Sequence, residues 1–261
     1  MPTRHAESVA ATIALSYTRL DAARAVDALA LTLLQRMAQL APAAIPQRLL
    51  VRLAGRNPDD ETQAVEVDGA LRRLSAVGLC EPLPEGGALL HRLIAAFARY
   101  EDGDSDTSGA AAIDGLISEV YAINQAGYPL RGKVYLPHLI ALAQPGVEYR
   151  AEQQATLLNN LGALLDAQGD LTGARPYYER ALAVRERVLG PEHPQTATLL
   201  NNLGALLRAQ GDLVGARPYY ERAVVILILR LGEQHPLTQT VQRNLAALLR
   251  ALEASQGGEA R

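Results

Sequence analysis

Residues 155–196 read ATLLNNLGALLDAQGDLTGARPYYERALAVRERVLGPEHPQT, and residues 197–238 read ATLLNNLGALLRAQGDLVGARPYYERAVVILILRLGEQHPLT. Of the 42 aligned positions, 30 are identical, so one stretch is a duplicate of the other. Self-similarity at such a period is typical of solenoids, in which one small unit stacks on the next. The fold should therefore be decided by how this unit packs on its copies.

Further copies flank the duplicated pair. A third copy begins at Gln239 and stops after the first half of the unit, so residues 239–252 are expected to form a terminal capping helix. Upstream, Gly127 and Tyr135 lie one period before their counterparts in the first duplicate. This alignment predicts a degenerate first repeat over residues 113–154.

Each unit has the pattern of two helices joined by a turn. Its first half places apolar residues on one helical face, at Leu158, Leu161, Leu164 and Leu165. Gly169 can then close the first helix and Asp170 can cap the second, which ends at the Gly190-Pro191 step. Pro176 should kink the second helix or delay its start, because proline lacks the N–H donor. A single pair cannot bury its apolar face, so neighbouring pairs must stack.

This pattern resembles the tetratricopeptide repeat, in the longer form found in kinesin light chains and in bacterial and fungal signalling proteins. The matching residues are Leu161, Gly162, Ala174, Tyr178 and Ala181, their counterparts Leu203, Gly204, Ala216, Tyr220 and Ala223, and the joints GPEHP and GEQHP. The resemblance covers residues 111–252. It implies a solenoid that binds a protein or peptide partner along the concave surface lined by its first helices.

Polar residues recur along that expected surface. Asn160, Asn202 and Asn244 form one ladder at the repeat period, and Thr156, Thr198 and Thr240 form another one turn earlier. The resemblance implies that such an asparagine contacts the backbone of an extended peptide, since an amide both donates and accepts hydrogen bonds. Alternatively, each asparagine only ties neighbouring helices together.

Other first-helix positions change character between repeats. Asn159 and Asn201 are followed by Arg243, and Asp166 is followed by Arg208 and Arg250. The C-terminal end of the surface is therefore basic. We expect a ligand there with acidic side chains or a C-terminal carboxylate.

One segment of the second duplicate is unexpectedly apolar. Leu227, Ile228 and Leu229 stand where the first duplicate has Arg185, Glu186 and Arg187. Large apolar side chains must be covered or form an exposed patch. The cover is the final helix, a second copy of the chain, or a partner protein, so these residues are candidates for self-association.

The first hundred residues have another pattern. Helical periodicity is expected over 9–20, 22–39, 45–53, 60–77 and 92–100, and Glu85-Gly86-Gly87 signals a hairpin turn before the last of these. Helices followed by a small hairpin predict a winged-helix-like domain. The fold class is thus all-α with a small β-hairpin wing, followed by the repeat solenoid.

The acidic, Gly- and Ser-rich segment 101–110 is the expected linker between the two parts. The predicted domains are 1–100, winged-helix-like; 111–252, repeats; and 253–261, a tail. The repeat region divides into 113–154, 155–196, 197–238 and 239–252.

A second resemblance concerns residues 9–100. The order SYTRL, LAPAAIPQRLL, ALRRLSAVGLCEP and LLHRLIAAFAR resembles the winged-helix region of NB-ARC signalling ATPases of the STAND class. That resemblance implies that His91, in LLHRL, reads the β-phosphate of bound ADP, although Leu90 and Arg92 depart from the family motif. The alternative is that His91 only packs against the wing.

The sequence contains no GxxxxGK[ST] phosphate-binding loop, and Lys133 is its single lysine. We therefore expect a regulatory and sensor part of such an ATPase, with the nucleotide-binding core encoded separately and any sensing by His91 exercised in trans or vestigial. A free-standing repeat adaptor is the near alternative. DNA binding is the distant one, because helix 60–77 begins with DDETQAVEVD and carries only Arg72 and Arg73.

Composition bounds the remaining possibilities. The net charge of −3 is spread along the chain, so no overall attraction to nucleic acid or anionic lipid is expected. Cys80 is the only cysteine, and no apolar run reaches membrane-spanning length. His5, His138, His193 and His235 lack metal-ligand spacing; the last two are expected to cap or pack at the repeat joints. We expect a cytoplasmic protein that is not an enzyme and needs no cofactor.

Overall fold

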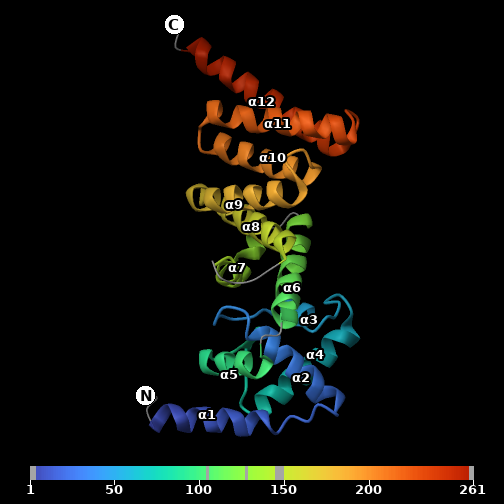
Figure 1. Ribbon diagram of the computed structural model, residues 1–261, viewed down its shortest axis with the longest axis vertical. Helices are drawn as coiled ribbons and strands as arrows, with labels where there is room; N and C mark the ends of the chain where they lie inside the picture. Colours follow the sequence, from blue (N-terminus) through green and yellow to red (C-terminus); the bar gives the residue numbers. More distant parts are fainter. Residues whose placement is uncertain (1–3, 104–105, 127–128, 145–149, 259–261) are drawn as a thin grey trace. The chain divides into compact units, whose positions relative to one another are not determined.

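The computed structural model describes residues 4–103, 106–126, 129–144 and 150–258, and it divides into two compact units, 1–148 and 149–261. Within the described residues the structure is all-α except for a two-stranded hairpin, as predicted. The helices of both units are labelled in Figure 1. No described helix is long and apolar enough to cross a membrane.

The N-terminal unit carries helices on either side of the hairpin. Its elements are α1 (Arg4–Tyr17), α2 (Ala25–Met37), α3 (Gln47–Leu53), α4 (Glu61–Ala76), β1 (Glu81–Pro82), β2 (Ala88–Leu89), α5 (Arg92–Asp102), α6 (Asp106–Gln125), the 3-10 helix η1 (Pro129–Tyr135) and α7 (Leu136–Leu142). The five helices predicted over residues 9–100 are all present.

Strand β2 of the hairpin is paired on both of its sides. Glu81 pairs with Leu89 and Pro82 with Ala88 in antiparallel register, and Ile45, before α3, forms a further antiparallel bridge to Ala88. This bridge was not predicted from the sequence. Gly87, with φ of +105°, would place a Cβ 2.3 Å from the Ile45 carbonyl oxygen, so only glycine fits there. The order along this part of the chain is helix α2, the bridge residue Ile45, helices α3 and α4, and then the hairpin.

The expected linker differs from what is observed. α5 continues to Asp102 and α6 begins at Asp106, so most of segment 101–110 is helical. α6 packs on α2 and α3 through an apolar face that includes Ile113, Leu116 and Val120, all buried. The buried carboxylate of Glu119 also accepts from Arg48 Nε at 2.7 Å. Segment composition suggested flexibility, but this face supplies enough buried contacts to order the helix.

The region predicted as a degenerate first repeat is consequently split. Residues 113–148 belong to the N-terminal unit, and Gly127 lies outside the described residues. Where the duplicates have a second helix of 19 residues, this region has the 3-10 helix η1 and then the short α7. The observed division near residue 148 thus differs from the expected one near residue 110.

The C-terminal unit is a stack of helices that follow one another along the chain (Figure 1). They are α8 (Ala151–Ala167), α9 (Leu171–Leu189), α10 (Pro194–Ala209), α11 (Leu213–Leu231) and α12 (Pro236–Gly258). The duplicates adopt the same conformation, since α9 and α11 begin and end 42 residues apart. α12 continues the stack, as predicted for a terminal helix.

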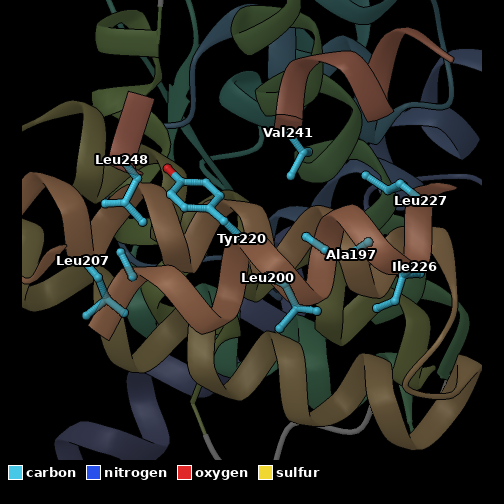
Figure 2. Packing of buried hydrophobic residues seen from close by; sticks show 10 residues of the cluster. Ala197, Leu200, Leu207, Tyr220, Ile226, Leu227, Val241 and Leu248 are labelled. Carbon is cyan, nitrogen blue, oxygen red and sulfur yellow. The ribbon is translucent and has the colours of Figure 1, made fainter. Parts of the chain in front are cut away.

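Close helix approach inside each pair depends on a glycine facing a tyrosine. A Cβ on Gly162 would lie 2.9 Å from the ring of Tyr178, and one on Gly204 would lie 3.1 Å from the ring of Tyr220. Both tyrosines are buried. Figure 2 shows Tyr220 in the apolar cluster that joins α10, α11 and α12.

The predicted helix boundaries are confirmed in atomic detail. Gly169 has φ of +82° after α8, and Asp170 caps α9 by accepting from Gly173 N–H at 2.9 Å. The expected delay at Pro176 is wrong, because α9 begins five residues earlier at Leu171. The aspartate cap fixes the first turn before the proline is reached.

Candidate functional site

The first helices of the stack, α8, α10 and α12, carry the predicted binding residues, and we call these side chains the first-helix face. Their asparagines interlock across neighbouring repeats. Asn202 Nδ2 donates to Asn159 Oδ1 at 3.0 Å, and Asn244 Nδ2 donates to Asn201 Oδ1 at 2.9 Å. The same junction is therefore formed twice, from α8 to α10 and from α10 to α12.

This register was not predicted. The sequence indicated a ladder of asparagines 42 residues apart, whereas the bonds join residues 43 apart. The doublets Asn159-Asn160 and Asn201-Asn202 could have indicated this register. In a doublet the first asparagine can bond to the next repeat and the second to the preceding one. The tie between neighbouring helices, one of the two alternatives for these residues, is thus present.

The ties leave part of each amide unused. A primary amide has two donor hydrogens and two acceptor lone pairs, and one tie uses a single group from each partner. Asn159, Asn201, Asn202 and Asn244 are all half-buried, so their remaining groups can reach solvent or a ligand. Asn160 differs: its exposed fraction is only 5%, and its Nδ2 has no hydrogen-bond partner among the residues that the structure describes.

The threonines of the face use their hydroxyls within their own helices. Thr156 donates to the Glu152 carbonyl at 2.9 Å, Thr198 to Pro194 at 3.3 Å and Thr240 to Pro236 at 2.9 Å. Such bonds to the carbonyl four residues earlier are common for threonine in helices. Arg185 Nη2 also donates to Thr156 Oγ1 at 3.1 Å. The threonines therefore offer a ligand acceptor groups rather than donors.

Three exposed arginines lie at the C-terminal part of the face. Arg243 donates to the Gln239 carbonyl and to Thr240 Oγ1, at 3.3 and 3.1 Å, and Arg250 donates to the Ala246 carbonyl at 3.2 Å. Arg208 has no hydrogen-bond partner among the described residues, and none of the three forms an ion pair there. They keep their full charge for a ligand, which is the basic character predicted.

The charged residue near the buried tyrosine of each pair changes sign between the two repeats. Burial and the nearby Asp166 carboxylate raise the pKa of Tyr178, while burial raises the pKa of Tyr220 and nearby Arg208 opposes that rise. The hydroxyl of Tyr220 is buried and has no hydrogen-bond partner within the described part of the chain. An arginine offers no acceptor, so the second repeat cannot satisfy this hydroxyl as a carboxylate could.

The three apolar residues of α11 have separate environments. Leu227 is fully buried in the cluster that includes Val241 and Leu248 of α12, Ile228 is half-buried, and Leu229 is 75% exposed. Figure 2 labels Leu227 within this cluster. Of the predicted covers, the final helix accounts for Leu227, and Leu229 is left uncovered.

His91 caps α5 in the N-terminal unit. Its Nδ1 accepts from Leu93 N–H at 3.2 Å, so a neutral ring carries its proton on Nε2. The imidazole is exposed beside a hollow of about 400 Å³ that is also lined by Pro42, Gly78, Cys80 and Arg92. Burial raises the pKa of the Cys80 thiol to about 11, so this cysteine is unreactive at neutral pH.

The candidate DNA-reading helix, α4, has less free positive charge than its sequence suggested. Arg73 Nε donates to the buried Asp27 carboxylate at 2.7 Å, and its Nη2 donates to the Arg19 carbonyl at 2.6 Å. That leaves Arg72 exposed on a helix that begins with Asp60 and Glu61. A phosphate backbone would meet little attraction there.

Comparison with known proteins identifies the stack. Residues 153–227 and 200–256 match the sequence model of the tetratricopeptide repeat. Residues 153–256 therefore form tetratricopeptide repeats. Repeats of this kind bind protein or peptide partners on the surface that their stacking creates.

Solved structures also match, and 28 of their chains do so. One is a crystal structure of BtubC (BKLC) from P. vanneervenii, with 21% sequence identity and a TM-score of 0.46. The alignment covers 59% of this chain and 60% of that one, so the chain spans less than two thirds of that structure's length. No curated protein sequence matches.

The repeat joints contain two histidines with a structural role. His193 Nδ1 accepts from Gln195 N–H and His235 Nδ1 accepts from Leu237 N–H, each at 3.2 Å. Their expected capping role is confirmed. Because both rings are used in the same way at successive helix starts, we assign them no part in ligand binding.

Proposed function

We propose that this chain is a protein-interaction module whose tetratricopeptide repeats bind an extended peptide along the first-helix face. The observation that carries the proposal is the coincidence on one face of half-buried amides with spare hydrogen-bonding groups and of three arginines without ion-pair partners. Extended peptides present alternating backbone donors and acceptors, which amides match. The repeats are tied together by the same amides, so the face is pre-organised for a ligand.

The preferred ligand carries negative charge. Arg208 lies on α10, and Arg243 and Arg250 lie on α12. None of the three is neutralised by a carboxylate among the described residues. Hydrogen bonds between guanidinium groups and carboxylates are stronger than those between neutral groups. We infer that acidic side chains or a C-terminal carboxylate occupy this end of the face.

A binding experiment tests the proposal with variants supplied by the chain itself. Arg208→Asp, Arg243→Asn and Arg250→Asp replace each arginine by the residue of an earlier repeat, so the triple variant should fold. Binding of a library of acidic peptides to the full chain, read by fluorescence anisotropy, should weaken by at least about tenfold in the triple variant. Peptides with an amidated C-terminus lack the terminal carboxylate, so their affinity shows how much of the binding is due to acidic side chains alone.

The control is Leu229→Arg, which changes charge outside the first-helix face. It should leave peptide affinity unchanged. Equal affinity of the wild type and the triple variant for every peptide that binds would contradict the placement of the ligand. Failure of every acidic peptide to bind would contradict its charge.

We further propose that the chain is the regulatory and sensor part of a STAND-type signalling system, with the N-terminal unit as its winged-helix-like region. Support comes from the order of elements in that unit and from the exposed imidazole of His91, whose Nε2–H can donate to a phosphate. A nucleotide-binding core would then be supplied by another chain. The first test is whether a neighbouring reading frame encodes a protein with a phosphate-binding loop. The second is whether that protein associates with this chain in the presence of ADP, and whether His91→Ala abolishes the association.

A free-standing adaptor, in kinesin-light-chain manner, needs only the repeats. It is distinguished by peptide binding that is indifferent to any nucleotide and to His91. DNA binding is the remaining alternative, and the pairing of Arg73 with Asp27 disfavours it. A gel shift with random duplex at low salt should show no retardation.

A further inference from the structure

The outward face of α11 carries a stripe of apolar residues, whereas the first-helix face on α8, α10 and α12 is polar and basic. Val214, Pro218, Val225 and Leu229 fall within about 60° of one another at the helical rotation of about 100° per residue. All four are exposed, with exposed fractions of 75% for Val214, 56% for Val225 and 75% for Leu229. Exposed apolar side chains gathered on one face mark interaction surfaces.

The sister helix shows that the fold does not need this stripe. At the equivalent positions α9 has Thr172, Pro176, Ala183 and Arg187, which are also exposed. The two helices have the same length, the same aspartate cap and the same buried tyrosine. Three substitutions from polar or small to large apolar residues therefore arose at solvent-facing positions of an otherwise duplicated helix.

The stripe is symmetric about its own midpoint. If two α11 helices pack antiparallel around a two-fold axis between positions 221 and 222, Val214 of one copy meets Leu229 of the other, and Pro218 meets Val225. At the axis, Glu221, which pairs with Arg217 of its own helix, lies beside Arg222 of the other copy. Both apolar and charged positions are thus matched by a single symmetry operation, as an interface between identical copies requires.

A hollow beside the stripe has the form to receive a side chain. It has a volume of about 550 Å³ and is lined by Pro191, Pro218, Val225, Ile226, Leu229 and Arg230, among others. Arg230 Nη2 pairs with Glu192 at 2.7 Å and Arg222 Nη2 pairs with Glu186 at 2.7 Å, so the rim is charged but balanced. A balanced rim around an apolar centre is typical of protein interfaces and gives no attraction to a polyanion.

We propose that the chain forms an antiparallel homodimer through the α11 stripe, with Val214 of each copy placed in the hollow beside Leu229 of the other. The occupant is a second copy because the stripe complements itself in both apolar and charged positions. The stripe is only about 22 Å long at 1.5 Å per residue, so the contact is small and a dissociation constant in the micromolar range is expected.

Sedimentation of the full chain over the micromolar range tests the dimer. The wild type should pass from monomer to dimer, whereas the triple variant Val214→Thr/Val225→Ala/Leu229→Arg, which carries the residues of α9, should stay monomeric with an unchanged circular dichroism spectrum. A wild type that remains monomeric throughout would overturn the proposal and leave the stripe to another protein. A triple variant that dimerises as the wild type does would also overturn it.

Cross-linking tests the orientation. A disulfide between positions 214 and 229 cannot form within one helix, so Val214→Cys/Leu229→Cys should give covalent dimers under mild oxidation. Cys80 is buried, so it should not contribute. The matched control is Thr172→Cys/Arg187→Cys on α9, which keeps the α11 stripe and should give no covalent dimer. Covalent dimers from Val214→Cys alone would contradict the antiparallel arrangement. Neither readout depends on peptide binding, so this proposal and the proposed function can fail separately.

Discussion

The pair α8–α9 and the pair α10–α11 share the residues that close their helices and differ in the residues that face their surroundings. Gly162, Tyr178 and Asp170 have identical counterparts in the second pair, and each has the same contact there. Seven of the differing positions are consecutive, 182–188 against 224–230, in the last two turns of the second helix. Duplication preserved the interior of the unit and changed its contacts with neighbours.

The differences follow from what lies next to each second helix. Arg185 on α9 is half-buried, with burial lowering its pKa, and it donates to Thr156 on α8. Its counterpart Leu227 is buried against α12, the last helix of the stack. Among the described residues α12 packs mainly on α11, so apolar contact with α11 holds it in place.

The largest effect on stability is expected when a residue of α11 is replaced by its counterpart in α9. Leu227→Arg would put a charge without a partner into the α11–α12 cluster and should lower the free energy of unfolding by more than about 3 kcal/mol. Leu229→Arg, two residues away and exposed, should change it by less than about 0.5 kcal/mol. Urea denaturation followed by circular dichroism at low protein concentration measures both. Similar losses in the two variants would mean that α12 does not cover Leu227.

A second prediction asks whether the shared interior is equally tight in both pairs. Gly162→Ala and Gly204→Ala should each destabilise by about 1–3 kcal/mol, because the added methyl meets the ring of Tyr178 or Tyr220. Gly162→Ala should cost at least as much, since its contact distance would be 2.9 Å rather than 3.1 Å. Thermal unfolding of both variants gives the comparison. Loss of less than a few tenths of a kcal/mol would show that the ring can move away.

A third prediction concerns the two tyrosines. Tyr220→Phe removes a buried hydroxyl without a partner and should stabilise the protein by about 1 kcal/mol. Tyr178→Phe, beside Asp166, should give no gain. Hydrogen exchange of α10 and α11 amides localises the effect to the second repeat. Equal gains in the two variants would show that Asp166 does nothing for the Tyr178 hydroxyl.

The smallest predicted effect is a pH dependence confined to the first repeat. Burial raises the pKa of Asp166 above its ordinary value of 3.8. The carboxylate is therefore less stable in the folded than in the unfolded chain, so its cost is present above the folded pKa and disappears as the pH falls below 3.8. Asp166→Asn should give a small gain, under about 0.5 kcal/mol, at neutral pH and none at pH 3.

The matched substitution for that test is Arg208→Asn. The arginine at the equivalent position of the second repeat stays charged over this pH range, so any change that its replacement causes should be the same at both pH values. A pH-dependent change in this variant would attribute the effect to another titrating group.

Much of the fold could be predicted from the sequence, for identifiable reasons. The repeat period, the Gly169 and Asp170 helix boundary and the terminal helix are all encoded within a few residues of where they act. The helical state of residues 106–110 could not be predicted, because it depends on α6 packing against α2 and α3, including the long-range pair Glu119–Arg48. The bridge from Ile45 to Ala88 likewise joins residues far apart in the sequence.

The sequence predicted which residues make up the candidate site but not which hydrogen bonds they form. The sequence indicated which asparagines and arginines share a face, since repeat spacing determines that. It did not indicate that Asn159 pairs with Asn202, because the offset of 43 depends on how one helix pair is rotated against the next. The separate environments of Leu227 and Leu229 also depend on that packing.

The asparagine ties have a consequence for how such a chain could grow. At each junction Asn202 or Asn244 pairs with the first asparagine of the preceding doublet, Asn159 or Asn201, and the two partners are 43 residues apart each time. A further copy of 42 residues inserted after Thr238 would find a matching amide on either side. A whole unit could therefore be gained or lost in one genetic event, because the new junction would use the same asparagine pair as the existing ones.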